Sequence, residues 1–318
     1  LIGSFVLLGV FPLIAKKIVD IVKARRVYAK WAHLKPRSYD RNLVVIGAGA
    51  AGLVTAYIGA AVKAKVTLVE SHKMGGDCLN YGCVPSKALI KTATLARQIR
   101  HSQDYGIARA EATIDFAQVM QRVAGVVERY TGLGVDVVIG RARITSPWHV
   151  EITKDDGSKQ TLASRSIVIA TGAAPFVPPL PGIDDVGYLT SDTLWGLREQ
   201  PKRLVVLGGG PIGCELAQSF ARLGSAVTQI EMLPRIMIRE DEEVSAYARQ
   251  ALEADGVTIL TGHKALRCEK SGDMKSIVVE SGGQERAVPF DVLLCAVGRS
   301  ARLKGFGLEE LGIAVNKT

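Results

Sequence analysis

Two glycine-rich turns constrain this chain more than any other feature, because each follows a short apolar strand and opens a helix. The first turn, GAGAAG, occupies residues 47–52, and the second, GGGPIG, occupies residues 208–213. The order strand, helix, strand is predicted around both turns, at 42–46, 49–64 and 66–70 and again at 204–207, 211–223 and 226–231. Alternating strands and helices are typical of parallel, doubly wound sheets. The sequence therefore predicts an α/β protein with two such domains.

The first turn has the composition of a loop that binds the phosphates of a dinucleotide. Gly47 allows a tight turn, Gly49 lets a pyrophosphate approach the backbone, and Gly52 lets the helix pack close to the strand. The start of the helix, where Ala51 lies, offers free N–H groups and a partial positive charge. Glu70 ends the second strand, where a carboxylate can accept hydrogen bonds from ribose hydroxyls. A glycine-rich turn without a ligand is the alternative, and the flanking elements favour the nucleotide.

The second turn repeats this arrangement and predicts a second dinucleotide. Its site residues are Gly208, Gly210, Pro211, Ile212, Gly213 and, at the end of the next strand, Glu231. The charge of Glu231 would repel a 2′-phosphate and bind a free 2′-hydroxyl, so NAD is favoured over NADP. Arg235 lies four residues further on and could weaken that preference.

The segment between residues 75 and 87, GGDCLNYGCVPSK, contains two cysteines, Cys78 and Cys83. Pro85 suits the first turn of a helix, which places Cys83 at or just before the helix start. Free N–H groups and the helix dipole there stabilise a thiolate. The sequence predicts a redox pair, because no other Cys or His lies nearby to complete a metal site. A metal site and a pair of buried structural thiols are the alternatives.

The other cysteines, Cys214, Cys268 and Cys295, fall in strand or helix patterns and are expected to be unreactive core thiols. Five cysteines in 318 residues are too few and too irregular for a secreted disulfide framework.

The net charge of +9 is concentrated near the start of the chain. Residues 1–41 contain nine Lys or Arg against Asp20 and Asp40, so the rest of the chain is almost neutral. A basic groove for nucleic acid is therefore not expected.

The start of the chain predicts a possible membrane attachment. Residues 1–15 are almost wholly apolar, and Lys16 and Lys17 follow at once. Fifteen residues are fewer than the ~20 that span a bilayer, so a truncated transmembrane helix is expected, with a soluble or interfacial helix as the alternative. Basic residues after a spanning segment would place the remainder at the cytoplasmic face of the inner membrane.

The chain divides into four predicted regions. An apolar helix and basic linker occupy residues 1–38, and the first dinucleotide-binding domain occupies 39–180. The second dinucleotide-binding domain follows at 181–297, and residues 298–318 form a further segment. Within the first domain, a long helix is predicted after Pro85, another at 115–130, and a small antiparallel β meander at 135–170 with a turn at Asp156 and Gly157.

From residue 41 to residue 317 the sequence resembles class I pyridine nucleotide–disulfide oxidoreductases, the group that contains dihydrolipoamide dehydrogenase, glutathione reductase and mercuric reductase. The resemblance rests on the cysteine segment, both glycine-rich turns, ATG at residues 170–172 and AVGR at residues 296–299. Their occurrence in the family's order makes a chance match improbable. The fold implied is two Rossmann-like domains, an FAD-binding domain at 39–180 and an NAD-binding domain at 181–297, with residues 298–318 beginning a second, truncated FAD-domain segment. The cofactors implied are FAD and NAD.

The resemblance also implies roles for individual residues. Cys83 would be the thiol beside the flavin, Cys78 the thiol that meets substrate, and Lys87 would lie near flavin N5, paired with Glu215. Further cofactor contacts are implied for Gly76, Asp77, Ala142, Ala170, Thr171, Gly172, Ala265 and Gly298. The full-length protein is expected to be a homodimer.

Some positions depart from the family pattern. Asp77 stands where many relatives have Thr, Tyr81 replaces a small apolar residue, and Ile212 replaces a Tyr found in some relatives. No segment here matches the family's second FAD motif or the C-terminal His–Glu pair, so an incomplete catalyst is expected.

The function predicted is electron transfer from NAD(P)H through FAD to the Cys78–Cys83 disulfide, and then to a small disulfide or a soft metal ion. No resident metal site is predicted. Two alternatives stay open: a diaphorase or quinone reductase that does not use the disulfide, and a membrane-tethered redox sensor without turnover.

Overall fold

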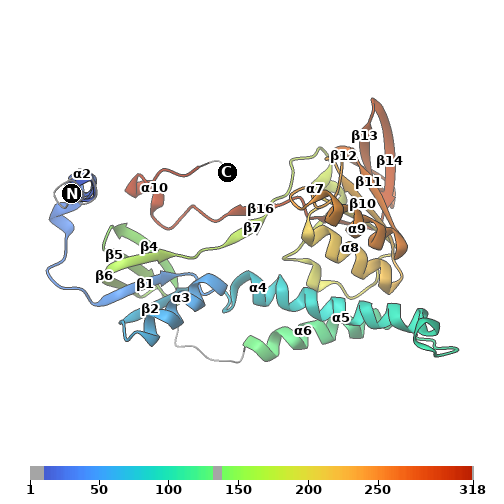
Figure 1. Ribbon diagram of the computed structural model, residues 1–318, viewed down its shortest axis with the longest axis horizontal. Helices are drawn as coiled ribbons and strands as arrows, with labels where there is room; N and C mark the ends of the chain where they lie inside the picture. Colours follow the sequence, from blue (N-terminus) through green and yellow to red (C-terminus); the bar gives the residue numbers. More distant parts are fainter. Residues whose placement is uncertain (1–10, 132–137, 317–318) are drawn as a thin grey trace, which may run out of the picture. The chain divides into compact units, whose positions relative to one another are not determined.

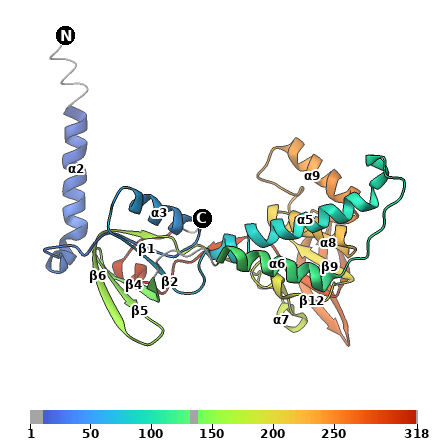
Figure 2. The ribbon, with the colours of Figure 1, turned by 90° about the horizontal axis from the view of Figure 1, so that it is seen from below.

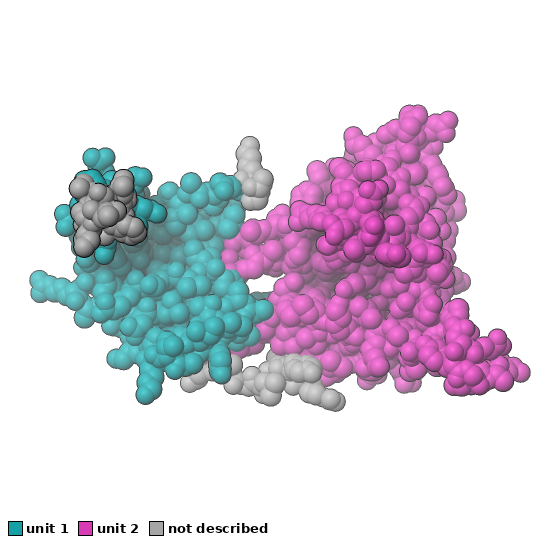
Figure 3. Space-filling view, in the orientation of Figure 1, with its two compact units in different colours: residues 1–72, 136–170, 303–318 teal, residues 73–135, 171–302 magenta. Residues whose placement is uncertain are grey.

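The computed structural model describes residues 11–131 and 138–316, which form two compact units. Unit 1 is assembled from three segments, 1–72, 136–170 and 303–318, and unit 2 from two segments, 73–135 and 171–302 (Figure 3). The chain therefore passes between the units four times.

Unit 1 is built on a six-stranded sheet in the order β3-β2-β1-β6-β5-β4 (Figure 1). Its strands are β1 (Arg41–Ile46), β2 (Val66–Glu70), β3 (Val138–Ile139), β4 (Arg141–Ser146), β5 (His149–Thr153) and β6 (Lys159–Ile169). The pairs among β3, β2, β1 and β6 are parallel, whereas β4, β5 and β6 form the predicted antiparallel meander. Helix α3 (Ala50–Ala61) packs on β1 and β2 (Figure 2).

The C-terminal segment returns to complete the core of unit 1. Phe306 and Leu308 are buried with strand residues such as Val44 and Ile152. The amide of Ile144 donates to the carbonyl of Phe306 at 2.8 Å. Helix α10 (Leu308–Leu311) follows directly.

Unit 2 contains a parallel five-stranded sheet in the order β11-β10-β9-β15-β8. Its strands are β8 (Leu189–Thr190), β9 (Arg203–Leu207), β10 (Ala226–Glu231), β11 (Val257–Thr261) and β15 (Val292–Cys295). Two antiparallel sheets accompany it, formed by β12 (Lys264–Ser271), β13 (Met274–Ser281) and β14 (Gln284–Phe290), and by β7 (Ala173–Pro175) and β16 (Arg299–Ala301). The five-stranded sheet is the second doubly wound element that the sequence predicts.

The helices of unit 2 bury their apolar faces on one another and on this sheet. They are α4 (Gly76–Asn80), α5 (Cys83–Arg100), α6 (Phe116–Thr131), α7 (Ile183–Val186), α8 (Pro211–Leu223) and α9 (Glu242–Ala254), with 3-10 turns η3 (Ser102–Tyr105) and η4 (Leu194–Gly196). Helix α5 packs against both α6 and α8, while α8 lies on β9 and β10. The cysteine segment therefore belongs to the same unit as the second glycine-rich turn.

The described chain begins with helix α2 (Phe11–Tyr28) and 3-10 turn η2 (Ala29–Leu34). The sequence predicts a linker from Lys16 onward, but the helix continues to Tyr28, because no Gly or Pro interrupts residues 16–28. The first ten residues of the predicted apolar helix lie outside the described residues. Among the helices between residues 11 and 131 and between 138 and 316, none has both the length and the apolar character needed to cross a membrane.

Candidate functional site

Two positions of the first glycine-rich turn, Gly47 and Gly52, accept only glycine. Gly47 has φ of 101°, in the left-handed region. A Cβ at Gly52 would overlap the carbonyl oxygen of Gly47, so the turn and the start of α3 touch backbone to backbone. This close packing leaves the N-terminus of α3 facing the end of β1, as a pyrophosphate site requires.

Glu70 organises the loops on either side of this turn. Its Oε2 accepts the amide of Ala48 at 2.7 Å, and its Oε1 accepts the amide of His72 at 2.8 Å. The side chain is buried, so these charge-assisted bonds hold its position. Each carboxylate oxygen keeps a lone pair with which to accept a ribose hydroxyl.

Unit 1 also brings Ala142 and Ala170 to this end of the sheet. The amide of Ala170 donates to the carbonyl of Ile46 at 2.8 Å, directly before the glycine-rich turn. The amide of Gly140 donates to the carbonyl of Glu70 at 2.8 Å, and Ala142 follows two residues later in β4. Thr171 and Gly172 continue the chain but belong to unit 2. There they are tied to Arg302, which accepts from the Thr171 hydroxyl at 2.8 Å and donates to the Gly172 carbonyl at 2.9 Å.

The second glycine-rich turn repeats the geometry of the first. Gly208 has φ of 116°, and a Cβ there would lie 2.5 Å from the carbonyl oxygen of Ala296. A Cβ at Gly213 would overlap the carbonyl oxygen of Gly208, whereas a Cβ at Gly210 would meet no protein atom within 4 Å. The open space beside Gly210 at the start of α8 fits a phosphate group.

Glu231 repeats the arrangement of Glu70. Its Oε2 accepts the amide of Gly209 at 2.6 Å, and its Oε1 accepts the amide of Leu233 at 2.8 Å. The predicted contact residue Ala265 lies close by in β12, because the amide of His263 donates to the Glu231 carbonyl at 3.0 Å. Pro211 is the first residue of α8, and Ile212 beside it is 37% exposed. Gly298 lies two residues after Ala296, whose carbonyl oxygen is the atom that a Cβ at Gly208 would meet.

Hydrogen bonds hold the Arg235 side chain within its own loop. Its guanidinium donates to the carbonyl oxygens of Met237, Ile238 and Glu240 at 3.2, 3.1 and 3.0 Å. Releasing it would leave three carbonyls to find new partners. Arg235 is therefore poorly placed to neutralise Glu231 or to bind a 2′-phosphate.

Gln229 supports the second turn, and the sequence analysis does not identify it. Its side chain is fully buried in β10, and its Nε2 donates to the carbonyl of Gly208 at 3.0 Å. Its Oε1 has no protein partner. A polar residue within the apolar strand pattern AVTQIE is the signal that could have revealed it.

The two cysteines lie on adjoining short and long helices. Cys78 is in α4, Gly82 is the N-cap, and Cys83 is the first residue of α5, as predicted. A hydrogen bond with the Cys83 thiol, together with partial burial, raises the pKa of Cys78. Cys83 is exposed and Cys78 is half-buried. The two thiols therefore lie within hydrogen-bonding reach of each other.

Arg299 and Trp195 fix the cysteine segment, and the sequence assigns a role to neither. Arg299 donates to Asp77 Oδ1 at 2.8 Å and to Ser191 Oγ at 3.0 Å. Trp195 Nε1 donates to the carbonyl of Tyr81 at 2.9 Å. Burial raises the pKa of Asp77, and the Arg299 guanidinium opposes that effect. These contacts join segments over 100 residues apart, which no local pattern reveals.

Lys87 and Glu215 are paired, as the resemblance implies. Lys87 Nζ lies 2.5 Å from Glu215 Oε1, which links α5 to α8 within unit 2. Both side chains are largely exposed, so the pair contributes little to stability. Gly76, with φ of 53°, lies at the start of α4 beside Asp77.

The remaining cysteines are core residues. Burial raises the pKa of Cys214, that of Cys268 to about 11 and that of Cys295 to about 12. They are therefore protonated and poor nucleophiles at neutral pH. Within the described parts of the chain, no three His, Cys, Asp or Glu side chains form a cluster that could hold a metal ion.

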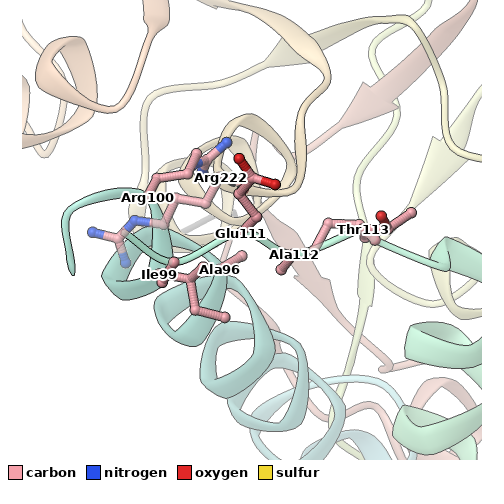
Figure 4. Close-up of a pocket in the computed structure, with 9 residues that line it drawn as sticks. Ala96, Ile99, Arg100, Glu111, Ala112, Thr113 and Arg222 are labelled. Atoms are coloured by element: carbon pink, nitrogen blue, oxygen red, sulfur yellow. Dashed lines mark hydrogen bonds between the residues drawn. The ribbon is translucent and has the colours of Figure 1, made fainter. Parts of the chain in front are cut away.

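A separate pocket lies at the C-terminal end of α5, away from the cysteines in sequence. Figure 4 shows Arg100, Glu111 and Arg222 among its lining residues. Arg222 is not free, because it pairs with buried Asp255 at 2.8 Å, and Arg97 approaches the same carboxylate at 2.9 Å. Burial alone would raise the pKa of Asp255, but bonds from Arg222, Gln218 and Arg97 outweigh it and lower the pKa. This cluster ties α5 and α8 to the end of α9.

Two dinucleotide loops and a dithiol at a helix start define a redox protein with two nucleotide sites. Comparison with known proteins agrees with this class. The sequence profile of the pyridine nucleotide-disulphide oxidoreductase family matches residues 41–318. The chain belongs to that family, which confirms the resemblance and the fold class predicted from the sequence.

Similar proteins include a dihydrolipoyl dehydrogenase of Thermus scotoductus, 37% identical over 88% of this chain and 61% of its own length. A mercuric reductase of Bacillus cereus is 33% identical over 87% of this chain and 45% of its own length. The HOCl-induced flavoprotein disulfide reductase RclA of Escherichia coli, solved as a Cu(II) complex, is 30% identical with a TM-score of 0.73. That alignment covers 88% of this chain and 61% of RclA. The chain thus spans about half to three fifths of these relatives.

Proposed function

We propose that the full-length protein is an FAD-dependent oxidoreductase that uses NADH to reduce the Cys78–Cys83 disulfide. The observation that carries this proposal is the position of Cys83 at the start of α5, with Cys78 in the adjoining helix α4, in the unit that holds the second glycine-rich turn. A dithiol at a helix N-terminus is suited to reversible disulfide chemistry.

The residues of both turns fit the cofactors that this function needs. Gly47–Gly52 and Glu70 in unit 1 suit the adenosine diphosphate part of FAD, and Gly208–Gly213 and Glu231 in unit 2 suit NAD. FAD, when bound, accepts hydride from the reduced nicotinamide and delivers two electrons to the disulfide. Lys87 would place a positive charge near the flavin, and Glu215 orients it.

NADH is the proposed donor because Glu231 is not neutralised. Its two oxygens accept backbone amides, and the nearest candidate cation in its loop, Arg235, is held by three carbonyls. A 2′-phosphate would meet an uncompensated carboxylate, whereas a 2′-hydroxyl would find an acceptor.

The acceptor proposed is a small disulfide or a soft metal ion. With a disulfide, the Cys78 thiolate attacks one sulfur, and the first substrate thiol leaves with a proton. Cys83 then attacks Cys78, which releases the second thiol and restores the Cys78–Cys83 disulfide. With a soft ion such as Hg(II), the two thiolates would bind the metal. The relatives' names include both substrate types, so the choice stays open to experiment.

The test compares Cys78→Ser, Cys83→Ser and the control Cys268→Ala in the full-length flavoprotein. Disulfide reduction with NADH should be lost in both Ser variants, while ferricyanide reduction persists. The long-wavelength absorbance of a thiolate beside flavin should survive in Cys78→Ser and disappear in Cys83→Ser. Cys268→Ala should change neither, because that thiol is buried and protonated.

The same experiment separates the alternatives. Disulfide or quinone turnover unchanged in Cys78→Ser would replace this proposal with the diaphorase function. Absence of NADH consumption with every acceptor, together with a disulfide that still opens and closes, would favour a redox sensor.

For the whole protein we also propose a homodimer at the cytoplasmic face of the membrane. Light scattering of the full-length flavoprotein tests the first part, since a mass of one chain would contradict it. Accessibility of α2 to a protease added to inverted vesicles tests the second.

A further inference from the structure

The loop between β10 and α9 contains a residue in a strained backbone conformation. Met237 has φ of 50°, in the left-handed region, which residues with a side chain adopt at a cost in free energy. Among the non-glycine residues that the structure describes, Lys63 is the only other one with a positive φ. Lys63 directly follows the end of α3, where this conformation commonly ends a helix. Met237 lies at no helix end, so other contacts must hold its conformation.

Arg235 holds Met237 in this conformation. Its guanidinium donates to the carbonyl of Met237 itself at 3.2 Å and to two later carbonyls of the same loop at 3.1 and 3.0 Å. One residue before Met237, the Ile236 side chain is 1% exposed, and the Ile236 carbonyl accepts the Ser245 hydroxyl at 2.7 Å. The backbone on both sides of Met237 is therefore fixed, and the loop cannot relax without breaking several hydrogen bonds.

The amide of Met237 supports the second glycine-rich turn. It donates to the carbonyl of Gly209 at 2.7 Å. That carbonyl and the N–H of Gly210 belong to one planar trans peptide, so they point in opposite directions. Gly210 is the N-cap of α8, and a Cβ there would meet no protein atom within 4 Å. Fixing the Gly209 carbonyl therefore fixes the direction of an N–H group beside the space that fits a phosphate.

We propose that Arg235 and Met237 are positioning residues for the nicotinamide dinucleotide at the second turn. Arg235 holds Met237 in the left-handed conformation, and the Met237 amide then holds the peptide between Gly209 and Gly210 in the orientation that offers its N–H to the pyrophosphate. The inference rests on the proposed use of this turn for NADH and does not depend on the electron acceptor. The role of Arg235 is the same for NADH and NADPH, because its side chain acts on the turn and not on the 2′-position.

The test measures the Kd of NAD⁺ for the oxidised full-length flavoprotein by calorimetry, a readout that needs neither Cys78 nor Cys83. Arg235→Met keeps the apolar stem and removes every donor. The turn should then lose one backbone hydrogen bond, and the Kd should rise about fivefold. The Kd of NADP⁺ should rise by the same factor. A side chain that binds the 2′-phosphate would instead weaken NADP⁺ binding alone.

Two changes at Met237 separate positioning from packing. Met237→Gly removes the side chain but adopts a positive φ without strain, so NAD⁺ should bind as it does to the wild type. Met237→Val keeps an apolar side chain, yet β-branched residues rarely adopt this conformation, so the Kd should rise about fivefold. A packing role predicts the reverse order. Lys63→Gly and Lys63→Val are the matched controls in unit 1 and should leave the Kd unchanged.

The double variant Arg235→Met with Met237→Gly tests whether the two residues act together. Its Kd should return to within about twofold of the wild-type value, because Gly at this position needs no support from Arg235. Lost attraction between the Arg235 charge and the phosphates would not be restored in this way. Far-UV circular dichroism checks that each variant is folded, and the comparison of Met237→Gly with Met237→Val decides the question if Arg235→Met does not fold.

Three results would overturn the inference. They are weaker NAD⁺ binding in Met237→Gly than in Met237→Val, an unchanged defect in the double variant, and a loss of NADP⁺ binding alone in Arg235→Met. Each would leave the dithiol function intact. A wild-type protein that bound no nicotinamide dinucleotide would contradict the proposed function as well.

Discussion

The two glycine-rich turns share their backbone geometry but differ in what supports them. In both, a carboxylate at the end of the second strand accepts one amide from the turn and one from the loop beyond the strand. In unit 2, Gln229 also holds the carbonyl of Gly208, whereas the corresponding residue of unit 1 is the buried, apolar Leu68. The second turn therefore has a side-chain support that the first lacks.

The helices after the turns differ as well. Helix α8 buries eight of its 13 residues, whereas α3 leaves Val54, Tyr57 and Ile58 more than half exposed. No other helix of the described part of unit 1 covers α3, while α5 packs on α8. Residues near the turn thus set the geometry of a dinucleotide loop. Its stability also depends on whether a helix from a distant part of the sequence packs on the helix that follows the turn. We expect unit 1 to depend on its ligand more than unit 2 does.

The largest effect should come from adding a methyl group inside each turn. Gly52→Ala and Gly213→Ala would each push a Cβ into a carbonyl oxygen of the turn. Gly52→Ala should lower the bound FAD by more than about tenfold, because overpacking costs 1–3 kcal/mol or more. Gly213→Ala should keep FAD and lose NADH binding, as measured by flavin content and NADH titration.

Gly125→Ala is the control, since a Cβ there meets nothing within 4 Å. If both turn variants lost the same cofactor, the assignment of one nucleotide to each turn would be wrong.

The next effect concerns the ion cluster around Asp255, which joins α8 to α5 and to the end of α9. Asp255→Asn should lower the free energy of unfolding at pH 7 by about 2 kcal/mol, because it leaves Arg222 and Arg97 without their buried partner. The pKa of Asp255 is lowered in the folded protein, so its contribution is present above the unfolded pKa. That contribution is lost as pH falls through the folded pKa.

Urea unfolding between pH 7 and pH 3 measures this difference. The wild type should lose more stability on acidification than Asp255→Asn. If the free energy of unfolding fell equally with pH in the two proteins, the cluster would not stabilise unit 2.

A smaller effect is expected at the carboxylates. Glu231→Gln should narrow the preference for NADH over NADPH by about tenfold in kcat/KM, because the charge that repels the 2′-phosphate is gone. Glu70→Gln, the matched change in unit 1, should leave that ratio unchanged. A wild-type preference for NADPH would show that a cation other than Arg235 serves the 2′-phosphate.

The smallest effect tests the support that distinguishes the turns. Gln229→Leu gives the second unit the residue type found at Leu68 in the first. Loss of one neutral hydrogen bond costs about 1 kcal/mol, so the Kd for NADH should rise about fivefold. Flavin content should not change, and an unaltered Kd would mean that the Gly208 carbonyl needs no side-chain support.

Local patterns predicted the parallel units well. Helix α8 and strands β2 and β10 have the predicted bounds, because strong apolar periodicity and a glycine-rich turn define their ends. The place of Cys83 at the start of α5 follows from Pro85. These features depend on neighbours in sequence.

Features that depend on distant residues were not predicted. Strands β12–β14 form an antiparallel sheet within unit 2. The glycines between these strands are the only local signal of that sheet in the sequence. The contacts of Arg299 with Asp77 and of Trp195 with Tyr81 join segments that are adjacent only after folding. The hydrogen bonds of Arg235 to three carbonyl oxygens likewise form only in the folded loop.

Because residues 303–316 complete the core of unit 1, that unit cannot finish folding until almost all of this sequence has left the ribosome. Strand β1 precedes all of unit 2 in the sequence, yet Phe306, which lies in the same core, follows about 260 residues later. Nascent chains stalled at Arg302 should therefore show unit 1 open to proteases, and protection should appear once Leu308 has emerged. Of these two units, unit 1 starts before unit 2 in the sequence and receives its last core residues after it.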